Sequence, residues 1–466
     1  ASTEDSRRAR VCALVPTISF SRIQPTVYLW GEGIAAELIL RFFWLVELGL
    51  RPGALPWPLL LWGLFCFFGL DEWPLLTEAA AKLPFREAGV VMWGRRNVIL
   101  QRGQDERTPD SPLWAERDMQ CDIAALGSRC PPIHTMTGWY DMFLRQGLDD
   151  FVAAQRCSQG AARLTVYVGG HFGVARTRLA DVRQATMDWY DRHLQGAPGP
   201  GSAPPVRLEV INGEAGREWL ESDTWPPPST NMDFFITSTE STAASERHGL
   251  LQATPPSPAA TLELCYTYDA RDPTPYAGGS WLNLRKDGVA DQRRVEARSD
   301  LLVLTSEPLQ EDLVIAGEVS ATLFMRSSAA ECDVVARLCA VRPIEEQAQP
   351  TLPWPFAPLP RKERSENVCE GISRVQFLAD DGPNKAMEVA VRLGATVCRF
   401  AAGDRVRLHV CSAAHPKWLR HPLQESGDWL AAERLGAPAE LVLQADSSHP
   451  SRLHLPVWQG ESQRQT

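Results

Sequence analysis

Residues 132–171 have the sequence PIHTMTGWYDMFLRQGLDDFVAAQRCSQGAARLTVYVGGH. Two runs within it, residues 132–137 and 163–168, are short and rich in apolar and β-branched side chains, which is typical of buried strands. The apolar spacing between them predicts a helix over 142–155, and a second helix is expected over about 178–194. Strands that alternate with helices in this way indicate a parallel α/β sheet.

A carboxylate and an imidazole follow the two predicted strands. Asp141 follows the first strand, and His171 comes directly after the second. Because the carboxyl ends of parallel strands meet at one edge of a sheet, we expect these two side chains to lie close together. An Asp that accepts a hydrogen bond from imidazole Nδ1–H fixes the tautomer and stabilises the imidazolium formed during acyl transfer. The alternatives are a helix N-cap for Asp141 and a structural role for His171.

The residues before this stretch predict a further strand and an apolar helix. Residues 11–20 (VCALVPTISF) are expected to form a buried parallel strand, and 34–50 have helical spacing. Residues 52–70 carry no charge, but three prolines leave only 59–70 as an uninterrupted helix. At about 1.5 Å per residue that helix spans about 18 Å, short of the ~30 Å core of a bilayer. We therefore expect a buried or lid helix there rather than a membrane span.

The second half of the chain has a different residue pattern. Residues 196–205 (GAPGPGSAPP) form a linker, and short β-rich runs separated by Gly, Pro, Asp and Ser follow it. Many short strands separated by such turn residues indicate a β-sandwich or jelly roll. The predicted strands cover residues 207–211, 232–236, 261–266, 301–305, 313–316, 320–325, 334–338, 374–377, 387–391 and 405–410.

Composition excludes several classes of function. The chain has 466 residues and a net charge of −10 without a long basic run, which argues against nucleic-acid binding. None of its 11 cysteines forms a C-x-x-C pair, so we expect buried free thiols in a reducing compartment, the cytoplasm. No nucleotide-binding motif is present and the other histidines lack metal-site spacing, so we expect no cofactor and no metal. No pattern indicates an oligomeric state.

The residues themselves do not identify a nucleophile. A serine hydrolase of this architecture carries its serine in a strained G-x-S-x-G elbow on an earlier strand. No such motif precedes Asp141. Ser19 and Ser21 lack flanking glycines, and Gly127-Ser128 has no glycine two residues after the serine.

Several segments match one known pattern. Residues 138–141 (GWYD) are followed by a predicted helix, the turn VGGHFG surrounds His171, and the helix after it ends in DWYDRHLQG. Further segments lie in the β-rich half: YDARDP (268–273), SDLL (299–302), SSAAECDVVARL (327–338), ENVCEGISR (366–374) and GDRVRL (403–408). Together they resemble the cocaine-esterase / X-prolyl dipeptidyl-peptidase (CocE/NonD) family of α/β-hydrolases. The family's G-P-W-x-H turn has Gly169-Gly170 here in place of Pro-Trp.

The resemblance implies an α/β plus all-β fold with three parts. Residues 1–24 and 121–198 would form a partial α/β-hydrolase core, 25–120 an inserted helical lid, and 205–466 a C-terminal jelly-roll β-sandwich. It also implies that Asp141 and His171 are the acid and base of a triad that cleaves a small ester or amide or a short peptide.

The resemblance also leaves part of the family's pattern without a match. The family's first strands and its nucleophile elbow have no counterpart in this sequence. We therefore expect either a fragment of a longer protein or a chain that has lost its nucleophile, inactive in both cases when it is alone. A parallel sheet without its first strands exposes an edge, so we expect poor expression of the whole chain, whereas 205–466 could fold alone.

Two other functions stay open at this point. Jelly rolls occur in lectins as well as in enzymes, so the jelly roll and lid could belong to a non-catalytic binding or interaction protein. A membrane protein anchored by residues 52–70 would instead depend on detergent.

Overall fold

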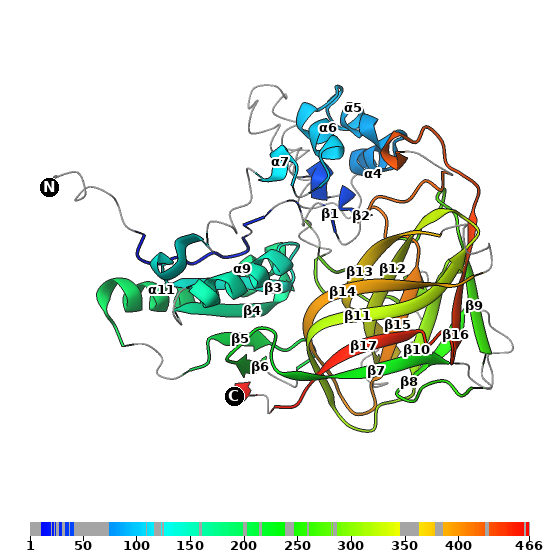
Figure 1. The fold of residues 1–466 in the computed structure, drawn as a ribbon. Helices are drawn as coiled ribbons and strands as arrows, with labels where there is room; N and C mark the ends of the chain where they lie inside the picture. Colours follow the sequence, from blue (N-terminus) through cyan, green and yellow to red (C-terminus); the bar gives the residue numbers. More distant parts are fainter. Residues whose placement is uncertain are drawn as a thin grey trace, which may run out of the picture.

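A computed structural model gives the fold of the chain, with an α/β layer beside a large β-sandwich and a group of short helices above them (Figure 1). The fold class expected from sequence, α/β plus all-β, is confirmed. The structure describes residues 11–19, 21–22, 24, 28–29, 33–36, 38–41, 74–108, 110–115, 123, 125–157, 161–198, 203–213, 217–237, 247–258, 261–280, 282, 287–344, 363–377, 385–424, 428–460 and 463–465.

The α/β layer is built on a five-stranded sheet within the described residues. Its strands lie in the order β18-β6-β5-β4-β3. Strands β3, β4 and β5 are parallel, whereas β6 and β18 run antiparallel to their neighbours. The strands are β3 (Ile133–Tyr140), β4 (Ala162–Gly170), β5 (Val206–Glu209), β6 (Arg217–Ser222) and β18 (Gln463–Gln465). All of β3 is buried, because helices or strands cover both of its faces.

Helices cover the two faces of this sheet. Helix α9 (Leu144–Cys157) packs on one face, where Leu164 and Val166 of β4 point. Helices α10 (His171–Thr177) and α11 (Leu179–Gln195) pack on the other face, toward which Tyr167 points. The two long helices lie where the sequence predicted them. Helix α11 ends at Gln195 because the following Gly196 takes a left-handed conformation with φ of 72°.

Residues 11–18 run alongside the outer edge of β3. Backbone bonds such as Leu14 N–H to Pro132 O (2.9 Å) and Met136 N–H to Pro16 O (3.0 Å) form a parallel ladder, as expected. The expectation that this strand is buried is wrong. Val11 is 60% exposed and Leu14 is 41% exposed, because only one side of the segment has a described neighbour in the sheet.

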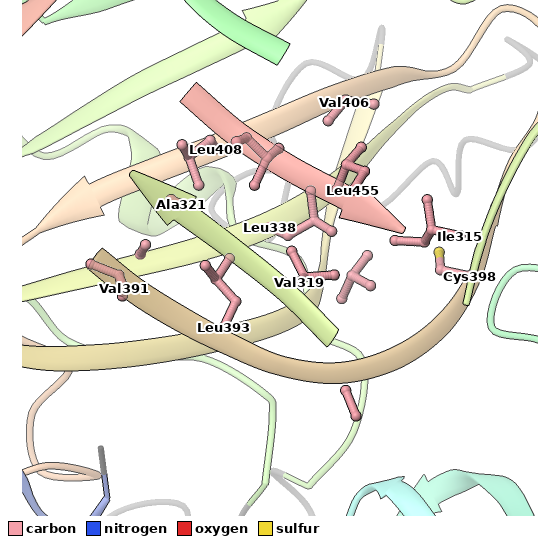
Figure 2. Packing of buried hydrophobic residues seen from close by; sticks show 14 of the residues in the cluster. Ile315, Val319, Ala321, Leu338, Val391, Leu393, Cys398, Val406, Leu408 and Leu455 are labelled. Atoms are coloured by element: carbon pink, nitrogen blue, oxygen red, sulfur yellow. The ribbon is translucent and has the colours of Figure 1, made fainter. Parts of the chain in front are cut away.

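Eleven strands of the described residues form the jelly roll. They are β7 (Ser229–Thr237), β8 (His248–Gln252), β9 (Thr261–Tyr268), β10 (Leu301–Ser306), β11 (Leu313–Ser327), β12 (Glu331–Pro343), β13 (Glu363–Gln376), β14 (Met387–Phe400), β15 (Arg405–Cys411), β16 (Ala439–Asp446) and β17 (Arg452–Trp458). Their inner faces bury a continuous apolar core, and Figure 2 shows Val319, Leu338 and Leu455 from three strands within it. Short turns at Arg293–Glu296 (α12) and Trp429–Ala431 (η7) connect strands.

The α/β layer and the jelly roll are joined by more than their connecting chain. The strand predicted at 207–211 belongs to the α/β sheet, where β5 pairs in parallel with β4, rather than to the jelly roll. Directly after β5, Ile211 forms a bridge to Cys398 of β14. One apolar core therefore continues from α9 and β3 into the sandwich.

Short helices form a second apolar cluster above the jelly roll. They are α4 (Pro74–Ala81), η2 (Phe85–Glu87), α5 (Ala88–Trp93), α6 (Val98–Asp105) and α7 (Pro112–Ala115), with a small hairpin β1 (Tyr28–Leu29) and β2 (Gly33–Ile34) nearby. The 3-10 helix η3 (Gly127–Arg129) precedes β3 and contacts α9 instead. Leu76 and Phe85 of these helices pack with Leu419 and Leu430 of the jelly roll. Arg86 and Asp428 form an ion pair of 2.6 Å across the same contact.

The apolar stretch at 52–70 lies outside the described residues, as does most of the helix predicted over 34–50. Within the part of the chain that is described, no helix combines the length and apolar character that crossing a membrane requires.

Candidate active site

The ends of β3 and β4 bring Asp141 and His171 together. The two strands are adjacent and parallel, with Tyr140 in register with Gly170, so the residues that follow them emerge at one edge of the sheet. Asp141 stands between β3 and α9, and His171 is the first residue of α10. His171 Nδ1 lies 3.1 Å from Asp141 Oδ1. The proximity expected from the sequence is present in the structure.

The carboxylate of Asp141 is buried and held by several donors. Its side chain has no exposed surface. The backbone N–H of Phe143 donates to Oδ1 at 3.0 Å, and the hydroxyl of Thr137 donates to Oδ2 at 3.4 Å. These bonds fix the carboxylate so that Oδ1 faces the ring, which is the arrangement that selects the tautomer with hydrogen on Nδ1.

The imidazole of His171 lies between two aromatic rings. The rings of Phe143 and Phe172 each meet it edge-on, with centroids 5.3 and 5.2 Å away. One fifth of the side chain is exposed. Nε2 has no hydrogen-bond partner among the described residues. The ring is therefore fixed through Nδ1, while Nε2 is available to accept a proton from another molecule or group.

Glycines allow β3, β4 and α10 to approach closely at this point. A Cβ at Gly138 would lie 2.3 Å from the carbonyl oxygen of Gly169 and 2.7 Å from a methyl of Val174. A Cβ at Gly169 would lie 3.1 Å from the backbone nitrogen of Val174. The Gly-Gly turn before His171 is therefore tightly packed on both sides, rather than loosened.

The jelly roll also contacts this edge of the sheet. The hydroxyl of Tyr140, the residue before Asp141, donates to the carbonyl of Asn367 in β13 at 3.1 Å. Asp287, between β9 and β10, accepts from the backbone N–H of Gly173 in α10 at 3.0 Å. No sequence pattern predicted either contact, because both join positions that are far apart in the chain and depend on how the two layers dock.

Two cavities border the α/β layer. One, of about 120 Å³, lies beside Asp141 between the two layers, and Trp139, Glu318, Glu370 and Lys417 line it. Burial raises the pKa of Glu318. The other, of about 620 Å³, lies under α11 on the opposite side of β4 and does not include the Asp–His pair. Asp141 is among the residues that line the smaller cavity, whereas His171 lines neither of the two.

The other residues singled out from sequence lie apart from the pair. His134 is buried in β3, with Nε2 at 2.9 Å from the hydroxyl of Thr165, and burial lowers its pKa to about 3. Ser21 is buried, and its backbone N–H donates to Asp150 of α9 at 3.1 Å while its hydroxyl donates to the same carboxylate. Ser19 is exposed. Neither serine is bonded to the imidazole.

Metal-binding groups and reactive thiols are not found near the pair. Within the residues that the structure describes, no three His, Cys, Asp or Glu side chains are grouped as metal ligands. Five described cysteines are buried free thiols: Cys130, Cys332, Cys339, Cys398 and Cys411. Burial raises the pKa of the Cys332 thiol to about 12, so it stays protonated and unreactive.

Comparisons with known proteins agree with this architecture. Residues 199–454 match the X-Pro dipeptidyl-peptidase C-terminal non-catalytic domain. The chain is 30% identical over 358 residues to the cocaine esterase of Rhodococcus sp. (strain MB1 Bresler), which covers 71% of this chain. The same match covers 57% of the esterase, so the chain spans less than two thirds of that relative's length.

Two solved structures share the fold. The aminopeptidase of a marine sediment archaeon, Thaumarchaeota archaeon, superposes with a TM-score of 0.71 at 19% identity, over 96% of this chain and 72% of its own. An α-amino acid ester hydrolase superposes with a TM-score of 0.65 at 20% identity, over 82% of this chain and 64% of its own.

Proposed function

Because the chain belongs to the cocaine-esterase / X-prolyl dipeptidyl-peptidase (CocE/NonD) family of α/β-hydrolases, we propose that Asp141 and His171 are the acid and base of a serine-hydrolase triad. The observation that carries this proposal is the 3.1 Å contact between Nδ1 of His171 and Oδ1 of a carboxylate that has no exposed surface. A helix N-cap alone would explain the bond from the Phe143 N–H to Asp141 Oδ1. It would not explain why the same oxygen also contacts the imidazole of His171.

The chemistry that this pair would perform is acyl transfer. A serine oxygen attacks the carbonyl carbon of the substrate while its proton passes to Nε2 of His171, and Asp141 stabilises the resulting imidazolium. The imidazolium then gives that proton to the departing alcohol or amine as the bond to the acyl group breaks. Water repeats the sequence in the second half and releases the acid, so His171 ends in its starting state.

We propose that the substrate is a small ester or amide, or a short peptide. The names of the relatives, a cocaine esterase, an α-amino acid ester hydrolase and an aminopeptidase, support carbonyl substrates of this size.

The 466 residues contain no G-x-S-x-G elbow before Asp141, and we propose that this chain alone forms no acyl-enzyme. Without the elbow, the serine and its oxyanion donors are both missing, and one such donor alone is worth about 10²–10³ in kcat. The test is labelling by a fluorophosphonate probe together with hydrolysis of a p-nitrophenyl ester. We expect no label and no turnover above buffer. Covalent labelling of the chain would contradict the proposed inactivity.

The reading frame upstream of Ala1 provides the matching test of the triad. If an in-frame elbow is found there, the longer chain should label with the probe and hydrolyse the ester. In that chain His171→Ala should abolish labelling, and Asp141→Asn should lower kcat by about 10⁴ while the fold is kept. Unchanged turnover in Asp141→Asn would remove Asp141 from the triad.

A further inference from the structure

Asp287 of the jelly roll reaches the turn that carries His171. It lies between β9 and β10, and its Oδ2 accepts from the backbone N–H of Gly173 at 3.0 Å. The backbone N–H of Phe172 donates to the same carboxylate. Both donors belong to the residues that directly follow His171 in α10. A side chain of one layer thus holds the first turn of a helix in the other.

The glycine before His171 gives independent support for this contact. A Cβ at Gly170 would lie 2.4 Å from Oδ2 of Asp287 and 2.5 Å from its Cβ. The backbone at Gly170 has φ of −91° and ψ of −170°, a conformation that any residue adopts. Space for Asp287, and not backbone strain, is therefore what requires glycine there.

The groups around Asp287 favour its charged form, which accepts hydrogen bonds from the turn after His171. Burial raises the pKa of Asp287, while the amides of Gly173 and Phe172 and the positive charge of Arg176 oppose that rise. The imidazole of His171 is close enough to act on the carboxylate in the same direction. Among the described residues, charged groups near His171 include Asp141 from the end of β3, Arg176 from α10 and Asp287 from the jelly roll.

We propose that Asp287 is a positioning residue for His171: through the amides of Phe172 and Gly173, the jelly roll sets the orientation of the imidazole against Asp141. The proposal rests on the proposed function for the catalytic meaning of that orientation. The orientation itself is a property of this chain and exists without a nucleophile. The jelly roll then contributes to catalysis through Asp287, although the side chain of Asp287 does not touch the reacting atoms.

The test is NMR of the ¹⁵N-labelled 466-residue chain, in which the Nδ1–H of His171 hydrogen-bonded to Asp141 gives a downfield signal. Loss of the signal in His171→Gln assigns it. We expect Asp287→Ala to lose or broaden this signal, because the first turn of α10 is released. Asp287→Asn should retain it, since the amide oxygen still accepts the backbone N–H. Asp272→Ala, which removes a carboxylate that is 78% exposed, is the matched control and should leave the signal unchanged.

Gly170→Ala keeps the proposal testable if Asp287→Ala does not fold. Its methyl group occupies the place of the carboxylate, so it should weaken the signal as Asp287→Ala does, and a thermal melt shows that the chain is folded. In an Asp287→Gly background the same alanine has space, and adding it should change the melting temperature little.

An unchanged His171 signal in a folded Asp287→Ala chain, or in a folded Gly170→Ala chain, would overturn the proposal. The signal requires no turnover. If a longer chain that carries an elbow neither labels with the fluorophosphonate probe nor hydrolyses the ester, that result would count against the proposed function without altering this one, and the reverse also holds.

Discussion

The jelly roll and the α/β layer differ in which polar side chains they bury and which apolar side chains they expose. In the jelly roll, Arg337, Glu370 and Lys417 form a buried network in which Arg337 Nε lies 2.8 Å from Glu370 Oε2 and both side chains are less than 10% exposed. The α/β layer leaves Leu14 exposed at its edge and buries one histidine, His134, whose Nδ1 has no partner. In both layers buried polar atoms remain without a partner among the described residues, such as Arg337 Nη2 and His134 Nδ1. The difference is that the α/β layer leaves an edge segment exposed, whereas the jelly roll encloses its charged network.

Buried polar contacts join the two layers and also join strands within the α/β sheet. Between the layers, Arg399 of β14 donates through Nε to Glu218 of β6 at 2.9 Å, and the pair is nearly fully buried. Within the α/β sheet, Trp139 of β3 donates to the carbonyl of Glu209 at 2.6 Å, which ties the strand that leads to Asp141 to β5.

The largest effect should follow from breaking the jelly roll's buried network. Glu370→Ala leaves Arg337 and Lys417 without their carboxylate in the interior, which should cost about 3–5 kcal/mol. Glu263→Ala removes a similar ion pair to Arg326, but Glu263 is 53% exposed, and should cost at most about 1 kcal/mol. Urea unfolding followed by tryptophan fluorescence measures both. Equal losses would show that the jelly roll does not depend on this network.

Acid should weaken the α/β layer through the buried His134. Burial, with a smaller contribution from Arg163, lowers the pKa of His134 from 6.5 to about 3. Between these values the unfolded chain binds a proton that the folded chain excludes. The stability from His134 is therefore complete above pH 6.5 and falls by up to about 1.4 kcal/mol per unit as the pH drops toward 3.

Glu370 gives the jelly roll a lower acid limit. Burial alone would raise the pKa of Glu370, but Lys417 and Arg337 outweigh burial and lower it from 4.5 to about 2. Its contribution is complete above pH 4.5 and is lost only as the pH falls toward 2. Hydrogen exchange as a function of pH should show β3 losing protection as the pH falls below 6.5. His134→Asn should reduce this loss of protection, and an unchanged loss in that variant would contradict the role of His134.

The smallest effect is expected at the exposed edge. Leu14→Ser should change stability by no more than about 0.5 kcal/mol, because the side chain is 41% exposed and the backbone ladder to β3 is kept. It should lower aggregation of the purified chain, measured by light scattering. Leu164→Ala, at a buried position of β4, is the contrasting change and should cost about 2–5 kcal/mol. A large loss of stability in Leu14→Ser would mean that the edge is covered in solution.

The part of the site that the sequence predicted is the part that follows from local pattern. Asp141 and His171 each come directly after a strand, and adjacent parallel strands end at the same edge, so their proximity needed no knowledge of other contacts. Asp287 could not be found in this way, because its place depends on the docking of a loop onto α10. Gly170 was visible only as a departure from a pattern, and its reason required coordinates.

The fold shows a similar limit. Residues 313–316 and 320–325 were predicted as two strands, yet they form one, β11, with a register shift between Val319 and Ser320. Gly317, with φ of 138°, produced the apparent break, because a glycine in a bulge and one in a turn look alike in sequence. The apolar run at 11–20 likewise indicated a strand, but pattern alone does not show whether a second neighbour covers it.

The Glu218–Arg399 pair has a consequence for anyone who recombines parts of such enzymes. A chimera that takes its jelly roll from this chain imports Arg399 together with Asp312, but leaves Glu218 behind on the donor's sheet. The host would then have to accommodate a guanidinium in its interior without the acidic partner that accompanied it. The workable crossover point lies before β5, so that both strands of the ion pair travel together, and the linker at 196–205 provides it.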